Sequence, residues 1–113
     1  MRTKKDTTSL CPMVEKKPGC IKAALAILGD KWTLLLVGHL LGEAHTFAEL
    51  EALLPGVSPR TLSERLTRLT EEKIIEAELY CARPKRYRYS PTEKGKELRA
   101  VLLKMAAWGE KYR

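Results

Sequence analysis

The sequence predicts a mainly α-helical domain that carries one small β hairpin. Two observations predict this fold class: apolar residues recur at helical spacing in several segments, and a stretch near residue 80 alternates as strands do. Helix caps, prolines and glycines separate these segments. At 113 residues, the chain has the length of one domain with its own hydrophobic core.

The chain begins with a polar segment that differs in composition from the rest. Residues 1–19 are rich in charge, and Pro12, Pro18 and Gly19 interrupt them. A segment of this composition buries too little apolar surface to fold by itself. We therefore expect a mobile basic N-terminal arm over residues 1–19 and one folded domain over residues 20–113.

Two helices open the predicted domain. The first begins near Cys20 and ends at Gly29, and its apolar residues recur at helical spacing. Asp30 can cap a second helix, which runs from Lys31 to about Leu41. This second helix is apolar almost all round, which is typical of a helix at the centre of a core.

Two more helices, joined by a short turn, follow along the chain. Thr46 caps the first of them, a short amphipathic helix that ends before Gly56. Ser58 and Pro59 then begin a helix that runs to about Lys73, because a hydroxyl cap followed by proline at the first helical position favours a helix start. Two helices joined by a short glycine-containing turn match a helix-turn-helix unit.

A hairpin and a final helix complete the prediction. Two strand-like runs, residues 74–80 and 86–90, flank a turn at Pro84. Thr92 begins the final helix, which ends near Tyr112. This order of elements is that of a winged helix-turn-helix with N- and C-terminal dimerisation helices.

The charge balance indicates the class of partner. The net charge is +7, and the basic excess lies outside residues 21–57, which are net acidic. A small basic domain favours nucleic acid or an anionic membrane surface, although a merely solvated surface is the alternative. The most apolar run, residues 32–41, is too short to span a membrane, and no apolar core follows the N-terminal charges. Three cysteines, an odd number, fit a reducing compartment, so we expect a cytoplasmic protein with no membrane partner.

The fourth predicted helix, about residues 58–72, is the candidate recognition helix. Leu62, Leu66 and Leu69 recur at steps of four and three, so they face inward and leave a polar face outward. Arginine can bind guanine bidentately in the major groove, and hydroxyls can contact phosphates or base edges. An ordinary solvated helix face is the alternative. The candidate DNA-binding residues of this helix are Ser58, Arg60, Thr61, Ser63, Arg65, Thr67 and Arg68.

The hairpin, about residues 80–89, is the candidate wing. Its tip carries four basic residues and no acid, which suits flanking phosphates or the minor groove. Basic residues also protect exposed edge strands from aggregation, which is the alternative explanation. Tyr87 and Tyr89 are expected to pack on the core rather than to stack on bases. The candidate DNA-binding residues of the wing are Arg83, Lys85, Arg86 and Arg88.

The apolar stripe of the final helix is wider than a domain of this size needs. It can cover the domain's own core, or it can form a two-fold interface together with the first helix and the N-terminal arm. We favour the interface, because dimers match palindromic operators. The candidate interface residues are Ile21, Leu25, Leu98, Val101, Leu102, Met105 and Trp108.

Two cysteines near the arm are candidate redox sensors. Neighbouring positive charge or a helix N-terminus lowers the pKa of a thiol and makes it reactive, which favours Cys20 and then Cys11. A passive thiol is the alternative. No Cys-x-x-Cys pair occurs, and His39 and His45 lack a cysteine at ligand spacing, so no metal is expected. The sequence also carries none of the common catalytic motifs, so we expect neither an enzyme nor a cofactor.

The chain resembles the HxlR-type winged helix-turn-helix regulators from about residue 20 to its end. The matching segments are residues 24–33 (ALAILGDKWT), 47–50 (FAEL), 54–66 (LPGVSPRTLSERL), 86–95 (RYRYSPTEKG) and 108–110 (WGE). The resemblance implies a dimer built from the first and last helices, a recognition helix over residues 58–69 and a wing at about residues 80–89. Some members sense electrophiles or oxidants through a cysteine just before the Lys-Trp helix. Cys20 lies about one residue from that position but lacks the proline that usually follows, and Cys11, which precedes Pro12 nine residues earlier, is the alternative.

Together these observations predict a sequence-specific regulator of transcription. We expect it to bind double-stranded DNA at a pseudo-palindromic operator as a homodimer, and to repress by occlusion. A non-specific or architectural nucleic-acid-binding module is the main alternative. A protein-interaction adaptor with the same fold is the third.

Overall fold

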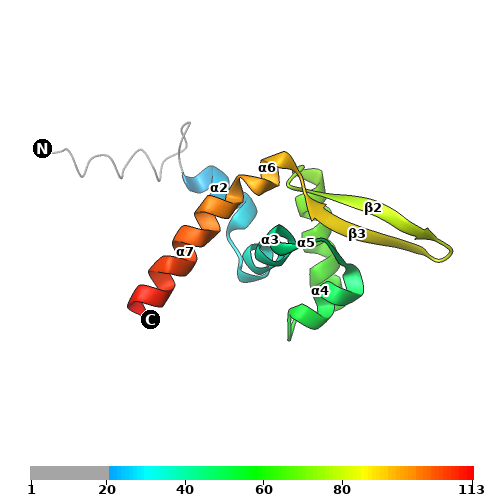
Figure 1. Ribbon diagram of the computed structural model, residues 1–113, viewed down its shortest axis with the longest axis horizontal. Helices are drawn as coiled ribbons and strands as arrows, with labels where there is room; N and C mark the ends of the chain where they lie inside the picture. The colour runs from blue at the N-terminus through cyan, green and yellow to red at the C-terminus, as the bar shows by residue number, and fades with distance from the viewer. Residues whose placement is uncertain (1–20) are drawn as a thin grey trace, which may run out of the picture. The chain divides into compact units, whose positions relative to one another are not determined.

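The computed structural model describes residues 21–113. These residues fall into two compact units, and the boundary between the units in the sequence lies between Lys31 and Trp32. The predicted arm and the two candidate sensors, Cys11 and Cys20, lie outside the described residues. The first unit contains α2 (Ile21–Leu28), whose residues are exposed or half-buried. Its bounds match the first predicted helix (Figure 1).

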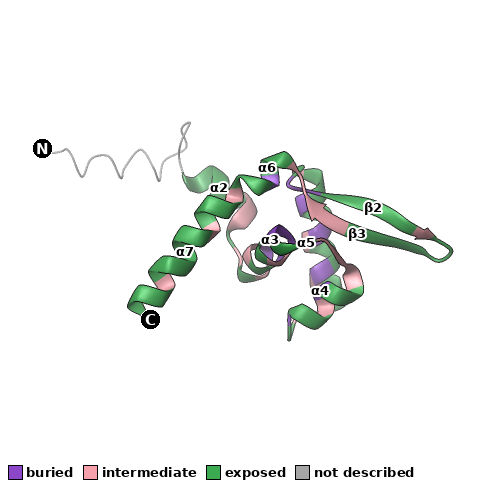
Figure 2. Cartoon of the chain, viewed as in Figure 1, coloured by how far each residue is buried: buried purple, intermediate pink, exposed green. Residues whose placement is uncertain are grey.

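Three helices and the base of a hairpin enclose the core of the second unit. The helices are α3 (Lys31–Gly42), α4 (Phe47–Leu53) and α5 (Pro59–Glu71). Figure 2 shows that the buried residues gather in them. The predicted central position of the apolar helix is confirmed, because Leu36, Val37 and Leu40 of α3 are at most 2% exposed.

Local capping interactions begin both helices of the helix-turn-helix unit. The Thr46 hydroxyl accepts a hydrogen bond from the Glu49 backbone N–H, and the Glu49 carboxylate accepts one from the Thr46 N–H. This capping box lowers the pKa of Glu49, chiefly through the Thr46 backbone N–H. In the turn, Gly56 has a φ of 93°, a conformation that glycine adopts without a steric cost. Ser58 caps α5 as predicted.

The sheet has three antiparallel strands, β1 (His45–Thr46), β2 (Ile75–Ala82) and β3 (Lys85–Pro91), in the order β1-β3-β2. The hairpin is longer than predicted, since Ala82 pairs with Lys85 and only two residues form its turn. The register shifts between Leu79 and Cys81, which marks a bulge. Strand β1 was not predicted, because two residues carry no periodic signal.

The end of α5 is tied to the end of the hairpin by hydrogen bonds. Lys73 has a φ of 62°, and the N–H groups of Lys73 and Ile74 donate to carbonyls of the last helical turn. The Thr92 hydroxyl, 2.6 Å from the Lys73 carbonyl oxygen and 3.1 Å from that of Ile74, donates to both. Gly95 lies so close that an added Cβ would overlap the Ile74 carbonyl oxygen. These contacts fix the base of the β2–β3 hairpin against the C-terminal end of α5.

The single final helix predicted from Thr92 is wrong, because two helices occupy that segment. They are α6 (Glu93–Lys96) and α7 (Leu98–Tyr112), with Glu97 between them. The break directly follows the turn that Thr92 and Gly95 hold against Ile74, and glycine itself weakens a helix. Over residues 21–113, no single helix has the length and apolarity to cross a membrane; α2 and α3 meet that criterion only as a bent pair with a break between them.

Candidate nucleic-acid interface

Helix α5 separates its apolar side from its polar side. Leu62, Leu66 and Leu69 are at most 2% exposed and anchor the helix in the core. The residues Arg60, Ser63, Thr67 and Arg68 are exposed on its other faces. From its N-cap to its C-cap the helix spans residues 58–72, which are the bounds predicted for a recognition helix.

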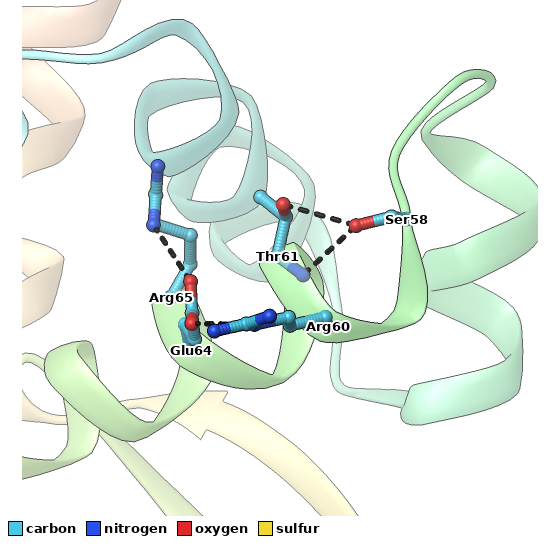
Figure 3. Close-up of polar contacts among 5 residues, drawn as sticks. All are labelled: Ser58, Arg60, Thr61, Glu64 and Arg65. Atoms are coloured by element: carbon cyan, nitrogen blue, oxygen red, sulfur yellow. Dashed lines mark hydrogen bonds and ion pairs between the residues drawn. The ribbon is translucent and has the colours of Figure 1, made fainter.

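The first turn of α5 is held by a pair of hydroxyls (Figure 3). The Ser58 hydroxyl accepts a hydrogen bond from the Thr61 N–H and donates one to the Thr61 hydroxyl, both at 3.0 Å. Thr61 is half-buried and Ser58 is exposed. The Thr61 hydroxyl keeps its own proton available for donation, so this turn presents a positioned donor beside a helix N-terminus.

Each arginine of α5 lies beside a glutamate of the same helix. Arg60 Nε is 3.2 Å from Glu64 Oε2, and Arg65 Nη1 is 3.7 Å from Glu64 Oε1, so two arginines share one carboxylate (Figure 3). Arg68 Nε is 3.6 Å from a carboxylate oxygen of Glu72. The side chain of Arg60 is 87% exposed, whereas that of Arg65 is 31% exposed. Exposed pairs of this kind contribute little stability, so phosphate or a base edge can replace the carboxylate.

The four predicted cations of the wing are exposed and have no such partner. Arg83, Lys85, Arg86 and Arg88 make no ion pair within the described part of the chain, although the charge of Arg88 contributes, as the smallest of the causes, to the lowered pKa of Glu49. The Arg88 guanidinium lies 4.8 Å from the centre of the Tyr80 ring, an arrangement that orients it without neutralising it. The wing therefore presents exposed cations that are available to an anion.

A hollow of about 250 Å³ separates the outer face of α5 from the wing. Ser63 and Thr67 line it from the helix, and Tyr87 and Tyr89 line it from β3. Burial, and to a smaller extent Tyr87, raises the pKa of Tyr89, so its hydroxyl stays protonated at neutral pH.

The prediction that both tyrosines pack on the core is wrong for Tyr87, which is 40% exposed. Alternation along β3 indicates on which face of the sheet Tyr87 lies, but not how far its side chain lies from the core. The sequence therefore did not indicate that Tyr87 belongs to this surface. Thr70 of α5 also lines the hollow, and it was not predicted from the sequence either.

The candidate interface residues differ in exposure. Val101, Met105 and Trp108 of α7 are 47–65% exposed, whereas Leu98 and Leu102 are half-buried. With Tyr112, which is 60% exposed, the three exposed residues recur at steps of four, three and four along one face of α7. In the first unit, Ile21 is 40% and Leu25 is 54% exposed.

Residues 21–113 include one cysteine and no candidate metal site. Of the three cysteines, Cys81 alone lies among the described residues; it is half-buried, and its thiol is 3.7 Å from the Arg83 carbonyl oxygen. Within residues 21–113, no group of three or more His, Cys, Asp or Glu side chains is arranged to hold a metal ion.

The family model of the HxlR-like helix-turn-helix matches residues 27–113. The chain belongs to this family. It is 36% identical over 105 residues to the HTH-type transcriptional regulator YvaP of Bacillus subtilis, covering 93% of this chain and 91% of YvaP. It is 31% identical to the HTH-type transcriptional regulator YodB of the same organism, over 92% of this chain and 87% of YodB. The resemblance predicted from the sequence is confirmed.

Solved structures agree with this assignment. The redox regulator HypR in its oxidised form has a TM-score of 0.76 at 31% identity, over 82% of this chain and 96% of HypR. A MarR-family regulator from Porphyromonas gingivalis has a TM-score of 0.79 at 25% identity, over 99% of this chain and all of that one. The protein is therefore a transcriptional regulator with a winged helix-turn-helix fold, in a family of regulators rather than of enzymes.

Proposed function

We propose that this regulator binds a pseudo-palindromic operator in double-stranded DNA as a homodimer and represses by occlusion. Helix α5 enters the major groove, and the β2–β3 wing lies on the flanking backbone or in the minor groove. The protein acts in the cytoplasm, where its DNA is. The folded domain of this proposal covers residues 20–113, preceded by a basic arm over residues 1–19.

One observation carries the proposal: a capped helix with a buried leucine face and an exposed polar face stands beside a wing of exposed, unpaired cations. A recognition helix needs the first feature, because its inner face must be rigid while its outer face contacts base edges. Phosphate binding needs the second, because cations release condensed counterions when they neutralise phosphates.

The residues divide by the contacts that they can make. Arg60, Thr61, Ser63 and Arg65 lie in the N-terminal half of α5, which is nearest the bases in this docking geometry. The remaining helix residues, Ser58, Thr67 and Arg68, are assigned to the backbone, together with the four wing cations. Phosphate contacts set the register of the protein on DNA, and base contacts give the sequence preference.

The homodimer is supported by the exposed apolar stripe of α7. An exposed stripe at steps of four, three and four is typical of a helix that packs against another helix. Sedimentation velocity tests it: we expect a dimer at micromolar concentration, and a monomer when Val101 and Trp108 are both replaced by Ser. A Leu53→Ser variant, which removes an exposed leucine from α4, is the matched control and should stay dimeric.

A redox response through Cys20 or Cys11 remains a prediction. It is supported by the likeness to HypR, which is named a redox regulator, and to YodB, which is solved in quinone-bound and diamide-treated forms. A Cys11→Ser/Cys20→Ser protein should keep DNA binding in the presence of a thiol oxidant that releases the wild-type protein. Full oxidant-dependent release from the double variant would contradict a role for either thiol.

Fluorescence anisotropy tests the proposed function. The protein is titrated at physiological salt with the DNA upstream of its own gene and with a shuffled duplex of the same composition. We expect tighter binding to the upstream DNA by a factor of about 10³ or more. Equal binding to both duplexes would favour the architectural alternative, and no binding to either at moderate salt would favour the adaptor.

A further inference from the structure

An open groove runs between α3 and α7, on a side of the second unit that the DNA proposal does not use. Its volume is about 530 Å³, within the range of roughly 300–1,000 Å³ found for small-molecule sites. The two helices pack closely at its floor, where a Cβ added to Gly38 would lie 3.5 Å from a methyl carbon of Leu102. Leu35, Leu103 and Met105, all 44–61% exposed, form much of its apolar wall.

Among the described residues that line this groove, Arg99 is the one with a permanent charge. Its Nη2 donates a hydrogen bond of 2.8 Å to the Leu41 carbonyl oxygen at the end of α3. That bond holds the guanidinium in place, and its other N–H groups have no partner among residues 21–113. The second titratable lining residue is His39, and none of the described lining residues is a carboxylate.

This combination of groups defines the chemistry of a ligand. The apolar walls favour a ligand with a hydrocarbon portion. The guanidinium is held in one position and has further N–H donors, so it favours an anionic group of the ligand at that position. We propose that the α3–α7 groove binds a small amphipathic carboxylate, with its carboxylate on Arg99 and its hydrocarbon body along Leu35, Leu103 and Met105. An amine of the same shape is excluded by the positive charge.

A second copy of the chain is the competing occupant, and the placement of exposed residues argues against it. Of the exposed stripe assigned to the dimer, Met105 lines the groove, whereas Val101, Trp108 and Tyr112 do not. Groove and stripe therefore lie on adjoining faces of α7 that share Met105, and the candidate interface residue Leu102 lines the groove as well.

The effect of the ligand on DNA binding rests on the proposed function. A ligand wedged between α3 and α7 acts on the helix that we assign to the dimer, and so on the spacing of the two recognition helices. Because half-site spacing on DNA is fixed by the helical repeat, a change in that spacing alters operator affinity. The groove would thus hold the effector of the regulator.

Isothermal titration calorimetry on the DNA-free protein tests the site. The probes are octanoate and 3-phenylpropionate, with octylamine as the cation of matched shape. We expect at least one of the two carboxylates to bind the wild type with one site per chain, and octylamine to bind at least about tenfold more weakly, as expected from the loss of a charge-assisted hydrogen bond.

Three variants separate a site from a general effect on α7. Arg99→Gln should weaken carboxylate binding by about tenfold or more, and Arg99→Lys should restore part of it. Gly38→Leu should abolish binding by filling the floor, whereas Lys104→Gln, which changes a neighbouring exposed cation that does not line the groove, should leave it unchanged.

Several results would overturn the inference. The inference fails if neither carboxylate binds, if octylamine binds as tightly as they do, or if Arg99→Gln keeps the wild-type affinity. It also fails if carboxylates bind only after dilution to the monomer, because a second copy would then fill the groove. These outcomes leave the DNA proposal standing, because it is tested separately by operator selectivity. Carboxylate binding without operator selectivity would confirm the site and contradict its role as an effector site.

Discussion

The arginines of α5 are held to different degrees by the protein itself. Arg60 is almost fully exposed, whereas Arg65 is largely covered and shares Glu64 with it. Helical periodicity predicted that both point away from the leucines. It could not indicate that one carboxylate engages both, because a pairing between neighbouring turns depends on the side-chain conformations that the packed helix allows.

Replacement of Arg65 by Ala tests whether this side chain contacts a base. We expect it to weaken binding to the operator by roughly 1–3 kcal/mol while binding to shuffled DNA changes much less. Anisotropy titrations with both duplexes measure the two losses. An equal loss on both would show that Arg65 contacts a phosphate instead.

Replacement of Glu64 by Gln tests the shared carboxylate. Removing its charge releases Arg60 for phosphate, so we expect tighter binding to any duplex and a salt dependence steeper by about one unit in log–log slope. Binding isotherms at several salt concentrations measure this slope. If Glu64 instead orients the arginines for bases, operator affinity will fall, which would contradict the account.

At the scale of elements, local signals were predictable and distant contacts were not. The caps at Thr46 and Ser58 depend on residues three positions apart, and both were predicted from the sequence. The break between α6 and α7 depends on Gly95 packing under the carbonyl of Ile74, 21 positions earlier in the chain. Strand β1 likewise exists only because β3 lies beside it.

Replacement of Gly95 by Ala tests that packing. The added Cβ overlaps a backbone oxygen that cannot move without displacing the strand, so we expect a loss of about 1–3 kcal/mol in the free energy of unfolding. Gly109→Ala is the control, because no atom lies within 4 Å of a Cβ added there. Urea unfolding compares the two, and equal stability of the variants would contradict the tight contact.

The capping box of α4 predicts a pH dependence of stability. The pKa of Glu49 is lowered from its ordinary value of 4.5, chiefly by the Thr46 N–H and to a smaller extent by His45. The charged form is therefore favoured in the folded state, and its contribution is present above pH 4.5 and lost as the pH falls through the lowered pKa.

Thermal unfolding of the wild type and of Glu49→Gln measures this contribution. We expect the wild type to be the more stable at neutral pH and the difference to shrink in acid, once Glu49 is protonated. A difference that stays constant down to the lowest pH would show that the hydrogen bond, rather than the charge, is responsible.

At the scale of the whole molecule, the order of helices, turn and hairpin was enough to predict the winged helix-turn-helix, since the main boundaries carry local signals such as the caps at Thr46, Ser58 and Thr92. The α3–α7 groove was not predictable in the same way. It arises where Gly38 lies opposite Leu102 and where Arg99 reaches the end of α3, and both contacts join residues about 60 positions apart.

The proposed function requires two copies of the protein on one DNA. A two-fold dimer with α5 in the major groove places its recognition helices on one face of the duplex, in half-sites separated by about one helical turn or a multiple of it. In the proposed complex, the basic wings would extend the contact to the phosphates on either side. Neither half-site alone should bind with comparable affinity.

Hydroxyl-radical footprinting combined with guanine N7 methylation interference, on the DNA upstream of the gene, tests this central claim most directly. The account predicts two symmetric protected regions on one face of the duplex, with interference at guanines in successive major grooves about 10 base pairs or a multiple apart. Protection that is uniform along the DNA, or a single half-site without symmetry, would contradict a dimer that recognises its operator through α5.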